Sequence, residues 1–261
     1  MRGLPALSLL ACAAVVHGNA FDDYVSKPET VYKWVDTGVT VKPILTDATA
    51  HVLNVTTLTW LDTSRAVLEP TNGAVWSHQV AVIVPSKVTE TNLAMAVMTG
   101  GCNDGNQVTA DEEYLAVAGD LAMRTGGVAV VIYQIPNCKY RFPSDPDQKS
   151  RQEDALIAWA WREYMDDPKH DPEWLPRFPM AKAGFLCMRA VQEYTKGLGL
   201  GLAIDGWVVA GASKRGWTTW MVGAATCVGD NCVEIKGLAP LVPIVPDLLV
   251  DVHQQYRSYG G

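Results

Sequence analysis

The stretch that decides the fold is Asp205-Gly206-Trp207-Val208-Val209-Ala210-Gly211-Ala212-Ser213-Lys214-Arg215-Gly216-Trp217-Thr218-Thr219-Trp220. Trp207 to Ala210 is a short apolar run of strand-forming residues, which predicts a buried strand. A Gly-x-Ser sequence follows directly, and the proline-free segment after it suits a helix. The pattern therefore predicts a strand, a tight turn that carries Ser213, and a helix.

This order of elements is the nucleophile elbow of α/β-hydrolases, where a strained turn pushes a serine hydroxyl outward. Small neighbours must let the strand and the helix approach each other. Gly211, two residues before Ser213, meets that need, but Arg215 stands two residues after it and Gly216 comes one place late. Ser213 is therefore a candidate nucleophile. The alternative is a serine that only caps the helix.

Composition places the chain among globular proteins. It has 261 residues, of which 48% are hydrophobic and 19% are charged, enough for one large α/β domain. The formal net charge is −7 and no basic run occurs. These features argue against nucleic acid or an anionic membrane as a partner.

The N-terminus is predicted to be a signal peptide that covers residues 1–20. Arg2 supplies a positive charge, Leu7 to Val16 an apolar stretch too short to span a bilayer, and Gly18-Asn19-Ala20 small residues at a cleavage point. No later stretch is long and apolar enough to cross a membrane. We therefore expect a secreted, extracellular protein; a membrane anchor or a disordered start is the alternative.

Export changes what the cysteines indicate, because disulfides are the default outside the cell. Cys102 and Cys138 each lie just beyond a predicted strand, so we expect them to meet at one edge of the sheet. Cys227 and Cys232 bracket a turn-like loop, which predicts a second, local bridge. Cys187 falls on an apolar helical stripe and is expected to be a buried free thiol.

Two other kinds of site are judged by spacing. No Cys-x2-Cys pair or close histidine cluster occurs, so neither a metal site nor a cofactor is expected. Asn54-Val55-Thr56 is a glycosylation sequon, which a secreted chain can use where Asn54 is exposed.

The alternation of strands and helices predicts the fold class. Val52 to Trp60 and Trp76 to Val84 read as leading antiparallel strands. Ala94 to Thr99 and Val128 to Tyr133 are predicted strands on either side of a helix with a capping box at Thr109-Ala110-Asp111-Glu112. Such a unit implies parallel strands with a right-handed crossover.

Further helices and one more strand follow. A second capping box, Ser150-Arg151-Gln152-Glu153, opens a helix, and Pro179 lies in the first turn of the next. Ile235 to Val245 predicts a strand after the elbow helix. We therefore expect residues 21–261 to be the N-terminal part of one doubly wound, mostly parallel α/β domain of the hydrolase type. Residues 21–50 show no motif.

The sequence identifies candidates for part of the oxyanion hole that a serine hydrolase needs. One donor is expected to be the backbone N–H after the nucleophile, here that of Lys214. The other is expected from the glycine-rich loop after the third strand, where Gly101, Cys102 and Asn103 are the candidates. A plain glycine turn is the alternative for this loop.

The sequence does not identify the general base or the carboxylate that orients it. In α/β-hydrolases both lie after later strands, in the order serine, acid, histidine. His253 is the sole histidine after Ser213, and it follows the very next predicted strand, as do Asp247 and Asp251. Upstream histidines are expected to be structural or solvated: His51, His78 and His170. The expectation is that the chain ends before the fold does and is inactive by itself.

Several segments together resemble the PhoPQ-activated pathogenicity-related proteins, a family that includes secreted autocrine proliferation repressor proteins of amoebae. The most specific is the elbow from Gly211 to Trp220, where the family has arginine at the position of Arg215. The resemblance runs from about Tyr32 to the end of the chain. Its other parts are Met98-Thr99-Gly100-Gly101-Cys102-Asn103, Glu153-Asp154-Ala155-Leu156-Ile157-Ala158-Trp159 and Pro179-Met180-Ala181-Lys182-Ala183.

The resemblance implies an α/β-hydrolase fold with Ser213 as the elbow serine, and an acid and a histidine in a C-terminal half that this chain lacks. The run Ser213-Lys214-Arg215-Gly216 is also similar to the Ser-Arg-x-Gly of glucuronoyl esterases, where the basic side chain after the serine holds the oxyanion. Lys214 is expected to act likewise.

Two functions follow from these features, and the sequence does not decide between them. One is a serine hydrolase of the esterase or peptidase type with a small-molecule or peptide substrate. The other is a non-catalytic secreted signalling or effector protein of the proliferation-repressor type with a cell-surface receptor. A structural remnant with neither role is the third alternative.

Overall fold

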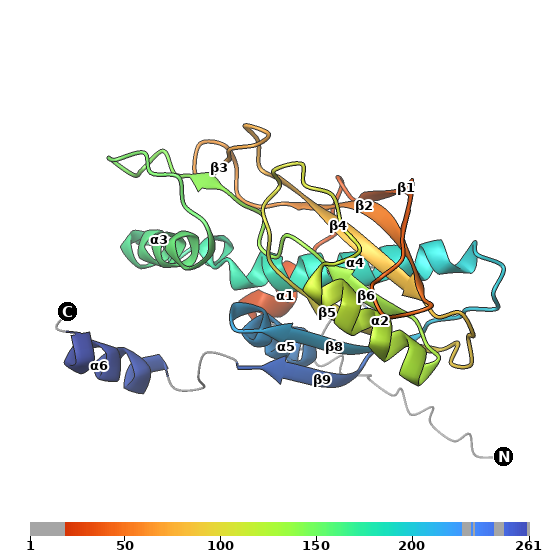
Figure 1. Ribbon diagram of the computed structural model, residues 1–261. Helices are drawn as coiled ribbons and strands as arrows, with labels where there is room; N and C mark the ends of the chain where they lie inside the picture. Colours follow the sequence, from red (N-terminus) through yellow and green to blue (C-terminus); the bar gives the residue numbers. More distant parts are fainter. Residues whose placement is uncertain (1–18, 226–230, 232, 243–247, 260–261) are drawn as a thin grey trace, which may run out of the picture.

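The computed structural model describes residues 19–225, 231, 233–242 and 248–259 (Figure 1). One seven-stranded sheet and one pair of two-residue strands lie in this part of the chain. The strands are β1 (Lys33–Val41), β2 (Thr49–Thr59), β3 (Val67–Leu68), β4 (Val75–Val84), β5 (Leu93–Met98), β6 (Ala129–Ile132), β7 (Tyr140–Arg141), β8 (Gly206–Ala212) and β9 (Ile235–Leu241). The helices are α1 (Ala20–Ser26), α2 (Glu113–Thr125), α3 (Glu153–Asp166), the 3₁₀ helix η1 (Pro172–Trp174), α4 (Arg177–Lys196), α5 (Lys214–Ala224) and α6 (Leu248–Tyr259).

The large sheet has the order β1-β2-β4-β6-β5-β8-β9. β6, β5, β8 and β9 are parallel to one another, whereas β4 is antiparallel to both β2 and β6, and β1 is antiparallel to β2. β2 therefore points the same way as β6, so five of the seven strands described in this sheet share one direction (β2, β6, β5, β8, β9). The predicted mostly parallel α/β sheet, with leading antiparallel strands, is confirmed.

The chain reverses its direction across the sheet between β5 and β8. It passes from β5 through α2 to β6, then returns through α3 and α4 to β8, and continues through α5 to β9. α2 lies on one face of the sheet, and α4 and α5 lie on the other (Figure 1). In doubly wound sheets, ligands bind at the carboxyl ends of the strands where the order reverses. The loops after β5 and β8 are therefore the place to look for a site.

The core has two halves because strand side chains alternate between the faces of the sheet. Ala129 and Val131 of β6 face α2, whereas Val130 and Ile132 belong to the larger core on the opposite face. α2 contributes an apolar stripe to the smaller core: Leu115, Ala118 and Ala122.

The N-terminal segment, for which the sequence shows no motif, contains α1 and β1. Lys182 of α4 is fully buried beneath it, where its ammonium donates to Lys27 O at 2.6 Å and pairs with the Glu29 carboxylate at 2.5 Å. On β1, the Trp34 indole N–H donates to Glu193 Oε2 at 2.7 Å. β1 is an edge strand whose residues are all at least partly exposed, so it carries no apolar pattern to predict it.

Neither predicted capping box forms. α2 begins at Glu113, and the cap is Glu112, whose carboxylate accepts from Leu115 N–H at 2.7 Å. α3 begins at Glu153 without a side-chain cap, and the Ser150 hydroxyl donates to Glu69 instead, at 2.6 Å. At α3 longer-range partners thus draw away the side chains that the local pattern would use, whereas at α2 the glutamate itself serves as the cap.

Candidate active site

Ser213 occupies the turn between β8 and α5, as predicted. Its backbone has φ 55° and ψ −119°, a combination that a serine rarely adopts, so the predicted strain is present. The residue stands at the N-cap position of α5, yet its side chain makes no capping hydrogen bond. It is partly buried. The helix-capping alternative is therefore wrong, and the hydroxyl is left available for chemistry.

Two glycines allow the close approach that this turn needs. A Cβ at Gly211 would lie 2.7 Å from Arg215 O, in the first turn of α5. A Cβ at Gly216 would lie 2.6 Å from the carbonyl oxygen of Leu241 on β9. Gly216 thus lets α5 pack closely against β9. The residue two after Ser213 therefore does not have to be a glycine, and Arg215 occupies that position.

The two predicted sources of oxyanion donors lie side by side. β5 and β8 are parallel neighbours with Met98 opposite Gly211, so the loop after β5 emerges next to the elbow. Lys214 is the first residue of α5, where backbone N–H groups lack a partner within the helix and the helix dipole favours negative charge. Across from it, Gly101 has φ 99° and turns the loop.

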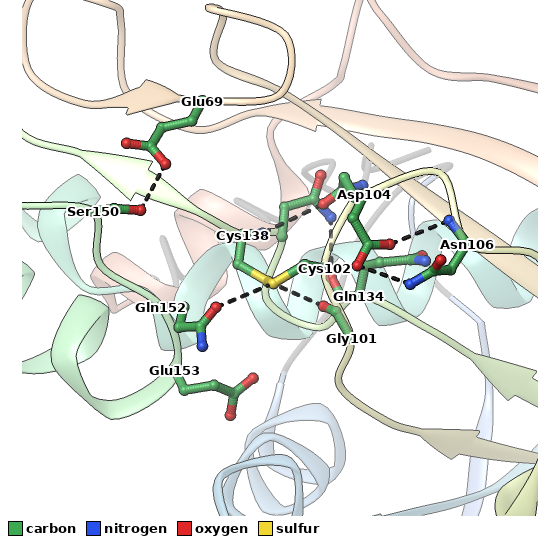
Figure 2. Close-up of a disulfide and its surroundings, with 12 residues drawn as sticks. Glu69, Gly101, Cys102, Asp104, Asn106, Gln134, Cys138, Ser150, Gln152 and Glu153 are labelled. Carbon is green, nitrogen blue, oxygen red and sulfur yellow. Dashed lines mark hydrogen bonds between the residues drawn. A yellow bond between two sulfur atoms is a disulfide. The ribbon is translucent and has the colours of Figure 1, made fainter.

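A disulfide joins Cys102 to Cys138, as predicted, with Cα atoms 4.9 Å apart (Figure 2). Beside it, Asn103 N–H donates to Cys138 O and Cys138 N–H donates to Asn103 Oδ1, both at 3.3 Å. The backbone N–H of Asn103 is thereby engaged. Gly101 and Cys102 remain as the loop's candidate donors, since no hydrogen bond from their N–H groups is found within the described residues.

Glu153, the first residue of α3, binds the two cations that follow Ser213. Its carboxylate accepts from Arg215 Nη1 at 2.9 Å and from Arg215 Nη2, and it pairs with Lys214 Nζ at 2.8 Å. Arg215 is 8% exposed and Lys214 is 7% exposed. Burial alone would raise the pKa of Glu153, but hydrogen bonds from Arg215 and Lys214 outweigh it and hold that pKa below its usual range. Glu153 is therefore a carboxylate fixed next to the elbow.

The Lys214 side chain is held by two carboxylates. Besides Glu153, its ammonium pairs with Asp154 Oδ1 at 3.1 Å. Both carboxylates belong to the first turn of α3, so in this structure the ammonium binds α3, and a role of Lys214 in an oxyanion hole stays a prediction.

Arg177 supports the same turn from α4. Its Nη1 donates to Lys214 O at 2.8 Å, and its guanidinium lies 4.7 Å from the Trp217 ring centroid. Burial, followed by the nearby charge of Arg215, lowers the pKa of Arg177 to about 10. The first turn of α5 is thus held by a buried cation of α4 and by a carboxylate of α3.

The described histidines do not contact Ser213. His78 is buried on β4, where its ring nitrogens lie 2.9 Å from Tyr133 O and 3.1 Å from Thr57 Oγ1, and burial lowers its pKa to about 4. His51 lies on β2, and His170 lies in an exposed turn with Nδ1 3.2 Å from Tyr164 O. Their predicted structural roles are confirmed. His253 is exposed on α6, which Figure 1 shows lying away from the sheet.

The remaining predictions concern cysteines, the glycosylation sequon and two aspartates, and some of these residues lie outside the part of the chain that the structure describes. Cys187 is buried and free, as predicted. Asn54 is exposed on β2, which leaves it accessible, although glycosylation stays a prediction. The Cys227–Cys232 bridge and Asp247 lie outside the described residues. Asp251 lies on α6.

Sequence reasoning missed the partner of the elbow cations. In the sequence, the segment that begins at Glu153 stands out only through the resemblance and through the predicted capping box that Glu153 ends. A physical signal was present, because two adjacent cations in a buried strand-to-helix turn require a nearby anion. It did not identify which of the chain's acidic residues supplies that anion.

Three cavities border these elements. A polar cavity of about 330 Å³ is lined in part by Gly100, Gly101 and Cys102, and another of about 340 Å³ lies at Asn103 and His78. An apolar groove of about 440 Å³ runs between α3, α4 and α5. The glycine-rich loop after β5, residues 100–103, thus has polar space beside it; because of its predicted role it is called the oxyanion loop below.

None of the helices in the described residues has the length and apolar character needed to cross a bilayer.

A known protein is similar to the whole of this chain. Autocrine proliferation repressor protein A of Dictyostelium discoideum is 34% identical over 260 residues, which is 100% of this chain and 48% of that protein. The chain thus spans about half the length of this relative.

Among solved structures, similar chains include acetyl xylan esterase 1 from Thermoanaerobacterium sp. (TM-score 0.44, 11% identity, 92% of this chain and 67% of that chain). Another is the glucuronoyl esterase from Solibacter usitatus (TM-score 0.37, 11% identity, 78% of this chain and 53% of that chain). The α/β-hydrolase assignment comes from the strand order and the serine turn described above.

A family model described as PhoPQ-activated pathogenicity-related protein matches residues 21–261. It covers all described residues but the first two. The chain therefore belongs to the family of PhoPQ-activated pathogenicity-related proteins.

Proposed function

We propose that this protein is a serine hydrolase of the esterase or peptidase type and that Ser213 is its nucleophile. The observation that carries the proposal is the strained turn at Ser213, with φ 55° and a hydroxyl that does not cap the helix it precedes. Backbone strain of this kind persists where the surroundings impose it, and it concentrates at active sites.

The proposed chemistry is acyl transfer. Ser213 Oγ attacks the carbonyl carbon of an ester or amide, and its proton passes to a general base. Negative charge then develops on the former carbonyl oxygen. The Lys214 N–H at the start of α5 and the N–H of Gly101 or Cys102 stabilise that charge. Each such donor contributes about 10²–10³-fold to the rate in well-studied hydrolases.

The proposed base and its orienting carboxylate are not among the described residues. His78 and His170 bond to backbone oxygens elsewhere, His51 packs against Tyr194, and His253 lies on α6. The relative that matches the whole chain is about twice its length. We propose that the acid and the histidine of the triad come from the part of such proteins that this chain does not cover.

The experiment is active-site labelling with a fluorophosphonate probe, performed on the protein encoded by the complete transcript. Ser213→Ala is expected to lower labelling by at least about 10³-fold, since no other group can form the covalent bond. Ser64→Ala, at an exposed serine of the β2–β3 loop that bonds only to Asp62, is the control and should label like the parent. Equal labelling of parent and Ser213→Ala would overturn the proposal.

A signalling role is the second candidate, because the relative that is 34% identical across the chain is named for repression of proliferation. In this role the hydrolase-like surface binds a cell-surface receptor without chemistry. The two candidates separate cleanly: a Ser213→Ala protein that loses labelling yet still slows proliferation supports signalling, whereas loss of both effects supports catalysis.

Secretion is proposed on three features: the N-terminal segment 1–20, the Cys102–Cys138 disulfide and the exposed sequon at Asn54. N-terminal sequencing of protein recovered from culture medium tests this directly. Recovery only from inside cells, with residues 1–20 intact, contradicts it.

A further inference from the structure

The Arg215 guanidinium is built into the junction between the elbow and the oxyanion loop. It is buried, and its Nε donates to the carbonyl oxygen of Ile135, in the loop after β6. Its Nη2 lies against Gly100, where a Cβ would approach to 2.6 Å. Arginine suits such a place, because its planar fork presents several fixed donors at once.

The two backbone segments that Arg215 contacts are bonded to each other. Ile135 N–H donates to Thr99 O at 3.0 Å, and Gln134 N–H donates to Gly100 O at 2.8 Å. Arg215 therefore contacts the root of the oxyanion loop and its support together. Since Arg215 belongs to the first turn of α5, its side chain fixes how far the Lys214 N–H lies from the N–H groups of the loop.

Glu153 holds this guanidinium from the other side. Both its carboxylate oxygens accept from Arg215, in a bidentate pair. Glu153 has φ 54°, in the left-handed region that a glutamate rarely occupies. Its neighbour Gln152 contacts the disulfide, with Oε1 3.4 Å from Cys102 Sγ, and Figure 2 shows both residues beside the bridge. The start of α3 thus touches the oxyanion loop and the elbow at once.

We infer that Glu153 is a positioning residue: through Arg215 it sets the spacing between the two halves of the oxyanion hole. The inference deepens the proposed serine hydrolase function and rests on it. In this inference Glu153 acts through Arg215 and not on the substrate itself. Its effect is on the rate of the chemical step, because a misplacement of about 1 Å at a reacting centre can lower a rate about 10²-fold.

The test measures the two parts of fluorophosphonate labelling separately, the reversible affinity and the first-order rate of bond formation, in the protein from the complete transcript. Glu153→Gln and Arg215→Lys are each expected to lower the first-order rate about 10²-fold with little change in affinity. The first-order rate of the double variant should fall no further than that of either single variant, because both substitutions break the same contact between Glu153 and Arg215.

Asp154→Asn is the matched control. Asp154 is the next residue, it also pairs with Lys214, and it does not touch Arg215; its side chain is 76% exposed. An exposed pair of this kind contributes little, so the labelling rate should stay within about twofold of the parent. Equal losses in Asp154→Asn and Glu153→Gln would mean that general charge matters and would overturn the inference.

A second measurement separates this inference from the proposed function. Amide hydrogen exchange of Asn103, Gln134 and Ile135, whose N–H groups are bonded at the root of the loop, should quicken in Glu153→Gln and not in Asp154→Asn, while β2 and β4 remain protected. If Ser213→Ala labels like the parent, the proposed function fails, and exchange still reports whether Glu153 holds the loop. Unchanged exchange together with an unchanged labelling rate in Glu153→Gln overturns the inference.

Discussion

Two helix starts at the same edge of the sheet use their first residues in opposite ways. At α2, the Glu112 carboxylate accepts from Leu115 N–H at 2.7 Å and from the Tyr133 hydroxyl at 2.8 Å. At α5, Ser213 stands in the equivalent position, yet its hydroxyl caps nothing and its backbone has φ 55°. The N-cap side chain holds the helix at one start, and at the other the serine hydroxyl takes no part in the cap.

The difference is informative because serine is among the best capping residues, and a serine cap stabilises a helix by about 1 kcal/mol. α5 gives up that stabilisation and tolerates strain besides. Its first turn is instead held by contacts that do not involve the serine, from Glu153 and Arg177. Stability and chemistry are therefore assigned to different residues of the same turn.

The largest expected effect comes from adding one methyl group at the elbow. Gly211→Ala places a Cβ 2.7 Å from the backbone oxygen of Arg215, which cannot move aside without shifting α5. We expect a loss of about 2–3 kcal/mol in the free energy of unfolding, measured by urea titration. Gly119→Ala in α2 is the matched control: its Cβ meets Pro43 and Thr46 side chains at 3.1 Å, and alanine's helix propensity offsets that crowding. Similar losses in both variants would contradict a special constraint at the elbow.

The next effect compares the two N-cap side chains directly. Glu112→Ala removes a cap and leaves the Tyr133 hydroxyl without its partner, so unfolding should become easier by about 1–2 kcal/mol. Ser213→Ala removes a hydroxyl that caps nothing, and its change should stay within about 0.5 kcal/mol. Thermal and urea unfolding of both variants check this. A larger loss in Ser213→Ala than in Glu112→Ala would show that the serine is structural.

Much of this fold is predictable from periodicity. Trp207 to Ala210 and Val128 to Tyr133 are apolar runs, and buried parallel strands need such runs because both their faces are covered. β1 is different, since every one of its residues is at least partly exposed and its pairing with β2 comes from backbone groups. A strand that buries little apolar surface leaves little trace in the sequence.

The candidate site is predictable only where it is local. Ser213, Gly211 and the strand-to-helix turn lie within a few residues, so their spacing carries the information. Glu153 lies 62 residues from Arg215, and its role depends on how α3 packs against the elbow. The capping box predicted at residues 150–153 is wrong for the same reason, because four consecutive residues cannot show that Glu153 bonds to Arg215 instead.

The smallest expected effect is a pH dependence of stability at the elbow. The folded-state pKa of Glu153 is lowered, so its carboxylate stabilises the folded protein above its unfolded pKa of about 4.3. That stabilisation is lost as the pH falls from there through the folded pKa, because the unfolded chain takes up the proton first. The side chain is 33% exposed, so solvent screening keeps the effect modest.

The difference in unfolding free energy between the parent and Glu153→Gln, measured by urea titration from pH 7 to pH 3, should be constant above about pH 5 and shrink below it. Asp154→Asn should show a smaller difference at every pH, since Asp154 is 76% exposed. A difference in unfolding free energy that grows as the pH falls would mean that the surroundings destabilise the Glu153 carboxylate. It would contradict a stabilising ion pair between Glu153 and Arg215.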